Sequence, residues 1–136
     1  MRVERDVVLD TTSEEAWRLL TDPDELATWL GTPIALDLEP GGVAAYIEPD
    51  GRVRHAVVEQ VTPGERLSFV WWSPGDDLAS RVVFELTEVE DGVKVAVSET
   101  HASTAGATIR LSAGAIWDDR LFDLERRCLE RQFVLV

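Results

Sequence analysis

The chain has 136 residues, of which 45% are hydrophobic and 29% charged, a composition typical of a folded globular domain rather than a disordered chain. Its 26 acidic and 13 basic residues give a formal net charge of -13, which repels nucleic-acid phosphates and anionic lipid headgroups. We therefore expect neither nucleic acid nor a membrane as a partner.

Neither a leader sequence nor a disulfide is indicated. Residues 1–6 lack the apolar core of a signal peptide, and the longest apolar runs fall far short of a membrane span. Cys128 is the only cysteine, which excludes an internal disulfide and favours a reducing compartment. We expect a cytoplasmic protein in which residues 1–136 form one domain.

A strand followed by a short helix is predicted at the N-terminus. Apolar and polar residues alternate over residues 3–9, which is typical of a strand. Thr12 and Glu15 have the spacing of a capping box, in which the first side chain caps the helix and the acid suits its dipole. A helix should therefore begin after Thr12 and continue to Leu20.

A second short helix should follow directly. Asp22 is a good N-cap, and Pro23 suits the first helical position, where a missing backbone donor costs nothing. The helix is expected to end at Trp29 or Leu30, with Gly31 as a left-handed terminator.

From residue 34 onward the pattern changes to a period of two. Turn sequences rich in Pro, Gly and Asp recur about every ten residues, and parallel strands would need much longer crossovers. Consecutive antiparallel hairpins are therefore predicted, with six further strands over residues 34–38, 43–48, 52–62, 66–73, 79–88 and 93–101.

The last segment, Ser112 to Phe133, predicts a long amphipathic helix. A helix of this length would be roughly 33 Å long, enough to cross a whole sheet. Residues 102–111, just before it, carry no clear pattern. The apolar positions of the helix recur at spacings of three and four: Ile116, Trp117, Leu121, Leu124, Cys128 and Leu129.

The order strand, two short helices, six antiparallel strands and long helix resembles the helix-grip fold of the START and Bet v 1-like superfamily. Within it, the chain resembles the family named for similarity to the activator of the Hsp90 ATPase. The resemblance covers nearly the whole chain. It lies in Ser13–Trp17, Asp22–Leu26, Trp29–Leu30, Glu39–Gly42, Val58–Leu67, Phe69–Trp71, Val82–Leu86 and Trp117.

The resemblance implies an α+β helix-grip fold, in which a curved antiparallel sheet of about seven strands wraps around the long C-terminal helix. Proteins of this fold commonly hold a hydrophobic ligand between sheet and helix, so a small hydrophobic molecule is the expected partner. Other members of the superfamily are cyclases or hydrolases, and the family name implies a chaperone partner and a role in stress responses. No cofactor is implied.

Strand phases select the residues that should line such a cavity, because the more apolar phase faces the core. The phase of Val93, Val95 and Val97 continues to Glu99 and His101. For residues 52–62 the phase containing His55, Val57 and Glu59 is expected to point inward. The predicted ligand-binding residues are Trp29, Ala45, Ile47, His55, Val57, Phe69, Trp71, Phe84, Glu99, His101, Trp117 and Leu121.

The polar members of this set, His55, Glu59, Glu99 and His101, allow two interpretations. They could orient a ligand or form an acid–base pair, because a histidine or a partly buried carboxylate can titrate near neutrality. Alternatively, Glu99 and His101 lie beyond the core at the strand end and face water. No local spacing supports a metal site, so none is predicted.

Five tryptophans also need a role. Trp17 and Trp117 are expected to pack in the core, whereas Trp29 and Trp71 could instead form a cavity wall. Trp72 should point outward, where it could mark a homodimer contact.

Overall fold

The structure, a computed structural model, describes residues 1–76, 78–101 and 107–133, with backbone only for residues 107–112. The strands and helices follow one another in the predicted order. Their bounds are β1 (Arg2–Leu9), α1 (Ser13–Thr21), α2 (Pro23–Trp29), β2 (Thr32–Leu36), β3 (Val43–Ile47), β4 (Val53–Thr62), β5 (Arg66–Trp72), β6 (Ser80–Val89), β7 (Gly92–His101) and α3 (Ala107–Gln132).

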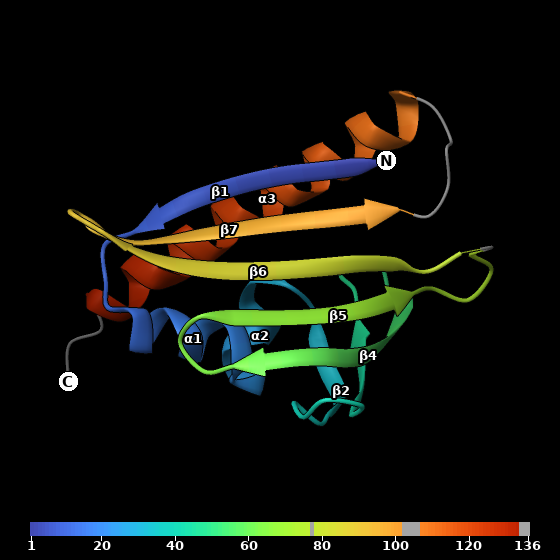
Figure 1. Cartoon of the computed structure of the whole chain (residues 1–136), viewed down its shortest axis with the longest axis horizontal. Coiled ribbons are helices and arrows are strands. Elements are labelled where there is room, and N and C mark those ends of the chain that lie inside the picture. Colours follow the sequence, from blue (N-terminus) through green and yellow to red (C-terminus); the bar gives the residue numbers. More distant parts are fainter. Residues whose placement is uncertain (77, 102–106, 134–136) are drawn as a thin grey trace.

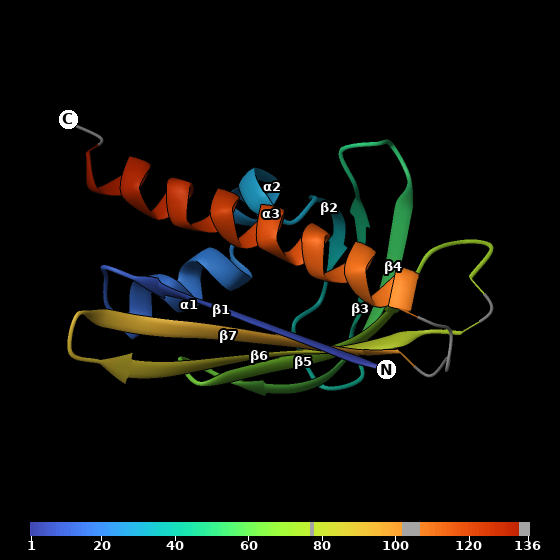
Figure 2. The same cartoon turned by 90° about the horizontal axis from the view of Figure 1, so that it is seen from above.

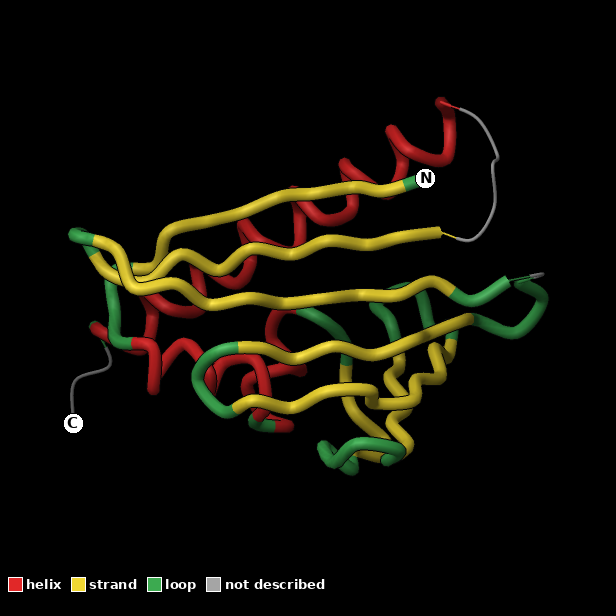
Figure 3. Tube along the Cα trace, in the orientation of Figure 1, coloured by secondary structure: helices red, strands yellow, loops and turns green. Residues whose placement is uncertain are grey.

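The strands form one antiparallel sheet in the order β1-β7-β6-β5-β4-β3-β2 (Figures 1 and 3). From β2 to β7 each strand pairs with the next in sequence, as expected for consecutive hairpins. β1 forms one edge of the sheet and pairs with β7, where Val3 lies opposite Glu99. The α+β helix-grip fold predicted from the sequence is confirmed.

All three helices lie on one face of the sheet, and the β3–β4 end of the sheet curves towards α3 (Figure 2). α3 packs against β1 and α2 and begins five residues before the predicted start. It buries Trp117, Leu121, Leu124 and Cys128, whereas Ile116 and Leu129 of the same apolar pattern are 46% and 47% exposed. No helix within the described ranges is long and apolar enough to cross a membrane.

The predicted helix starts are confirmed. The Thr12 side chain accepts a hydrogen bond from the backbone N–H of Glu15, and Asp22 accepts bonds from the N–H groups of Asp24 and Glu25. The expectation for Gly31 is wrong, since it is not among the glycines with positive φ. A Cβ there would lie 3.3 Å from the Cβ of Tyr46, so close packing against β3 is what suits a glycine at this position.

The inward phase of β4 is opposite to the prediction. Ala56 and Val58 are buried opposite Trp71 and Phe69, whereas Val57 is 37% exposed. The cause is a register shift between Val58 and Gln60, at which the strand gains one residue and its phase reverses. Residues before and after this bulge therefore obey different phases, which a single alternating pattern cannot show.

The phase of β3 was also predicted wrongly, because β3 pairs in register with the first part of β4. Ala44 and Tyr46 are buried in the core, while Val43 and Ile47 are exposed on the outer face. Ala45 is buried but lies opposite His55 in the outward phase. The apolar character of Val43 and Ile47 misled the prediction, since single exposed apolar residues are common on protein surfaces.

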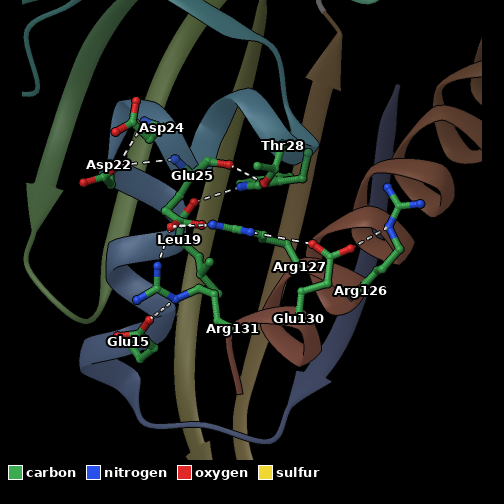
Figure 4. A network of polar contacts seen from close by, with 11 residues as sticks. Glu15, Leu19, Asp22, Asp24, Glu25, Thr28, Arg126, Arg127, Glu130 and Arg131 are labelled. Carbon is green, nitrogen blue, oxygen red and sulfur yellow. Dashed lines mark hydrogen bonds and ion pairs between the residues drawn. The ribbon is translucent and has the colours of Figure 1, made fainter. Parts of the chain in front are cut away.

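A buried carboxylate ties α2 to the C-terminal half of α3 (Figure 4). Glu25 accepts two hydrogen bonds from Arg127, at 2.7 and 3.2 Å, and pairs with Arg131 as well. Arg131 also contacts Glu15 on α1. The hydrogen bond from Arg127, together with the charges of Arg127 and Arg131, outweighs the cost of burial and lowers the pKa of Glu25.

We predict that Glu25→Gln lowers the free energy of unfolding by about 2 kcal/mol, between the values for exposed and buried ion pairs. Because the folded-state pKa is lowered, this contribution is present near neutrality and is lost as the pH falls through that pKa. Urea denaturation at pH 7 and at decreasing pH measures both effects.

Glu59→Gln is the matched control for this substitution. Glu59 makes the same bidentate contact with Arg81, at 2.7 and 3.2 Å, but its side chain is 37% exposed on the outer face of the sheet. Its removal should cost less than about 1 kcal/mol. Equal losses from both variants would contradict the structural role assigned to Glu25.

Candidate functional site

Aromatic side chains occupy the space between the sheet and the helices. The indoles of Trp71 on β5 and Trp117 on α3 stack with ring centroids 5.9 Å apart. Phe84 on β6 meets Trp117 edge-on at 5.7 Å, and Trp29, at the end of α2, meets Phe84 at 5.9 Å. Each of these side chains is at most 5% exposed, so together they form much of the core.

Glu99 lies inside this aromatic cluster and is only 4% exposed. One carboxylate oxygen accepts hydrogen bonds from the indole N–H of Trp71, at 2.7 Å, and from the hydroxyl of Ser80, at 2.5 Å. The other oxygen accepts the indole N–H of Trp117 at 2.9 Å. The carboxylate thereby holds one indole of the sheet and one of the helix in fixed orientations.

The protonation state of Glu99 follows from these contacts. Burial acts to raise its pKa, but the hydrogen bonds from Ser80, Trp71 and Trp117 and the nearby His101 outweigh burial and lower the pKa. Glu99 is therefore ionised at neutral pH. A carboxylate with three donors already bound is suited to positioning its neighbours rather than to accepting a proton.

His101 lies next to Glu99 at the end of β7. Its Nε2 is 3.7 Å from a Glu99 oxygen, and the side chain is 23% exposed. Glu99 and His101 therefore meet, as the acid–base hypothesis requires, and the alternative in which Glu99 faces water is wrong. His55 does not join them, because it lies in the outward phase of β4 and stacks on Trp72 at 6.0 Å.

Two arginines lie against the indole pair. The guanidinium of Arg54 on β4 lies 4.3 Å from the ring centroid of Trp71. The guanidinium of Arg120 on α3 lies 5.1 Å from that centroid and 4.7 Å from the centroid of Trp117. These are cation–π distances, so the indole rings hold the two guanidiniums in place.

The two arginines share one carboxylate. Glu48 accepts a hydrogen bond from Nε of Arg54 at 2.5 Å and lies 3.5 Å from a terminal nitrogen of Arg120. All three side chains are less than one fifth exposed. Burial and the nearby Arg54 lower the pKa of Arg120 to about 10, although Glu48 and Glu99 act in the opposite direction.

These residues line a pocket of about 280 Å³ at the junction of α2, the β3–β4 turn and α3. Trp29, Leu30 and Ile116 form its apolar wall, and Arg54 and Arg120 form a cationic floor. The acidic rim includes Asp50 and Asp123, which pair with Arg52 and Arg126. The arrangement combines apolar surface with a few convergent polar groups, as small-molecule sites do.

The structure divides the predicted site residues into two groups. Phe69, Trp71, Phe84 and Leu121 are buried in the core together with Trp29 and Trp117, and Glu99 and His101 lie beside this cluster. Ala45, Ile47, His55 and Val57 are on the opposite phase of the sheet and do not face α3. This part of the prediction is corrected by the β4 bulge described above.

The polar residues of the pocket were missed. Arg54 belongs to the phase of β4 that was expected to face outward, Arg120 to the polar positions of α3, and Glu48 to the end of a strand. Only the small residue Ala56, which makes room opposite Trp71, could have indicated the correct phase. No group of three potential metal-ligating side chains is found in the part of the chain that the structure describes.

The sequence shows which protein family the chain belongs to. The sequence model of the family "Activator of Hsp90 ATPase homolog 1-like protein" matches residues 10–125, most of the chain. This confirms the resemblance found in the sequence. No curated protein matches.

Solved structures share the fold. DynU16, a protein in the dynemicin biosynthetic locus, is 26% identical with a TM-score of 0.85; the match covers 92% of this chain but only 46% of DynU16. Protein MLL2253 from Mesorhizobium loti is 23% identical with a TM-score of 0.87, covering 98% of this chain and 100% of that one. CalU16 from Micromonospora echinospora is 24% identical with a TM-score of 0.75, covering 93% and 74%.

We predict that Glu99→Gln lowers the free energy of unfolding by about 2 kcal/mol, because an amide cannot accept at both ends and leaves an indole N–H unpaired. Ser80→Ala removes a single donor to the same carboxylate and should cost about 1 kcal/mol. Urea denaturation measures both. A Glu99→Gln protein as stable as the wild type would show that the cost of burying the charge cancels its hydrogen bonds.

Proposed function

We propose that this protein binds a small, largely apolar molecule in the pocket at the junction of α2, the β3–β4 turn and α3. The observation that carries the proposal is the pocket itself, in which Trp29, Leu30 and Ile116 form an apolar wall beside two largely buried arginines. Its volume of about 280 Å³ suits a ligand of one or two rings.

Of the ligand-binding residues predicted between sheet and helix, Trp29 is the one that lines this pocket. The buried indoles of Trp71 and Trp117 occupy the inner part of this space, so the ligand would lie outside them, against Arg54 and Arg120. Family membership agrees with binding of a small molecule but names no ligand. The neighbour DynU16 belongs to a biosynthetic locus, which makes a role with small molecules a reasonable proposal for this chain too.

An acid–base enzyme is the second candidate, and the close approach of Glu99 and His101 is the observation that favours it. The contacts of Glu99 weigh against it, because its oxygens already accept three hydrogen bonds and its pKa is lowered. A chaperone partner and a homodimer through the face of Trp72 stay predictions, as does a cytoplasmic location. A mass in solution that does not change with concentration would remove the dimer.

Binding is tested by titration with N-phenyl-1-naphthylamine, a neutral apolar dye that fluoresces in apolar surroundings. We predict saturable binding to the wild-type protein. Ile116→Glu should weaken it about tenfold, because the ligand would have to desolvate a charge in the pocket wall. Ile116 is 46% exposed, so the fold should tolerate the change.

Phe122→Glu is the matched control. Phe122 is also an apolar residue of α3, 64% exposed, and is not among the residues that line the pocket. Its substitution should leave the dye affinity unchanged. Failure of the dye to bind the folded protein, or an equal effect of both variants, would contradict the proposed site.

A further inference from the structure

Two guanidiniums and one carboxylate form the floor of the pocket, and Glu99, on the indoles, is a further negative charge near Arg120. Arg54 and Arg120 both lie against the indole of Trp71, and Glu48 is the carboxylate that contacts both guanidiniums. Only the contact to Arg54, at 2.5 Å, has the length of a strong hydrogen bond, since Arg120 is 3.5 Å away. One carboxylate cannot saturate the N–H donors of two guanidiniums.

We infer that the pocket selects ligands that carry a single oxyanion, such as a carboxylate, on an apolar ring body, and that Arg54 and Arg120 bind this group together. The inference rests on the proposed function, because it concerns the same pocket and names the class of its ligand. The apolar wall of Trp29, Leu30 and Ile116 would hold the ring, and the arginine floor would hold the anion.

The arginines are already oriented for this task. Stacking on Trp71 and Trp117 restricts both guanidinium planes, and Glu99 in turn fixes the two indoles from below. A planar guanidinium held in this way loses little freedom when it binds a carboxylate through paired N–H groups. Burial of Arg120, which lowers its pKa to about 10, adds a reason for an anion to stabilise the site.

The acidic residues of the rim do not cancel this preference. The rim carries three acidic residues. Asp50 and Asp123 are 49% and 38% exposed and are paired with Arg52 and Arg126, and Asp119 is exposed to solvent. Exposed charges are screened by salt over about 10 Å, whereas the largely buried guanidiniums of Arg54 and Arg120 would act on a bound anion at contact distance. The net charge of -13 opposes polyanions such as nucleic acids far more than a ligand with one charge.

The test compares two dyes that share an aromatic body. 8-Anilinonaphthalene-1-sulfonate carries a sulfonate, and N-phenyl-1-naphthylamine is its neutral counterpart. The readout is the ratio of their affinities for each protein. Arg120→Gln and Arg54→Gln should each lower the affinity for the anionic dye, relative to that for the neutral dye, at least about tenfold, because a charge-assisted contact is lost. A purely structural role would lower both affinities together and leave the ratio unchanged.

Glu48→Gln tests the inference in the opposite direction and does not depend on losing a contact. It removes the carboxylate that competes with the ligand for both guanidiniums. The affinity for the anionic dye should rise about fivefold or more relative to the neutral dye. A fall in this ratio would overturn the inference.

Arg126→Gln is the control for binding elsewhere. Arg126 lies on α3 with its side chain 58% exposed and pairs with Asp123 and Glu130. If this variant lowers the ratio and the pocket variants do not, the anionic dye binds the outer face of α3 and the inference is wrong. If neither dye binds, the proposed function fails. If both dyes bind and the ratio of their affinities is unchanged by substitution of Arg54, Arg120 and Glu48, only the oxyanion preference fails.

Discussion

The buried carboxylate of Glu99 is the contact on which the interior of this protein depends. A charge at this depth is costly unless it is fully hydrogen-bonded, and here the donors come from β5, β6 and α3. The bonds therefore join the sheet to the helix at one point and leave little freedom for the two indoles. An apolar residue at position 99 could fill space but could not orient Trp71 and Trp117.

That orientation extends outward to the pocket. Arg54 lies over the ring of Trp71 and Arg120 over the rings of both indoles, and Glu48 accepts a hydrogen bond from Arg54 at the rim. From the core to the surface, the carboxylate of Glu99 contacts the indoles, the indoles contact the arginines, and the arginines contact Glu48. Such a preorganised set is what a binding site requires and is more than core packing needs.

Two separate ion networks join α3 to other elements of the fold. Glu25 with Arg127 and Arg131 joins α2 to the C-terminal half of α3 (Figure 4), whereas Glu48 with Arg54 and Arg120 lies at the pocket. Family membership accounts for the fold that both networks share, but it does not determine the side chains at the pocket. Function in this family must therefore be read from the residues of each member.

The sequence by itself determined the elements and their order. Caps at Thr12 and Asp22, turns at regular spacing and the stripe of Trp117, Leu121 and Leu124 are local signals, and local backbone physics is enough to interpret them. It also placed Glu99 on the inner phase of β7. Only the tertiary structure decided which residues meet, because a bulge at Glu59 reverses the phase of β4. That reversal turns Arg54 inward and His55 outward, and it depends on pairing with β5, a contact that alternation along one strand does not encode.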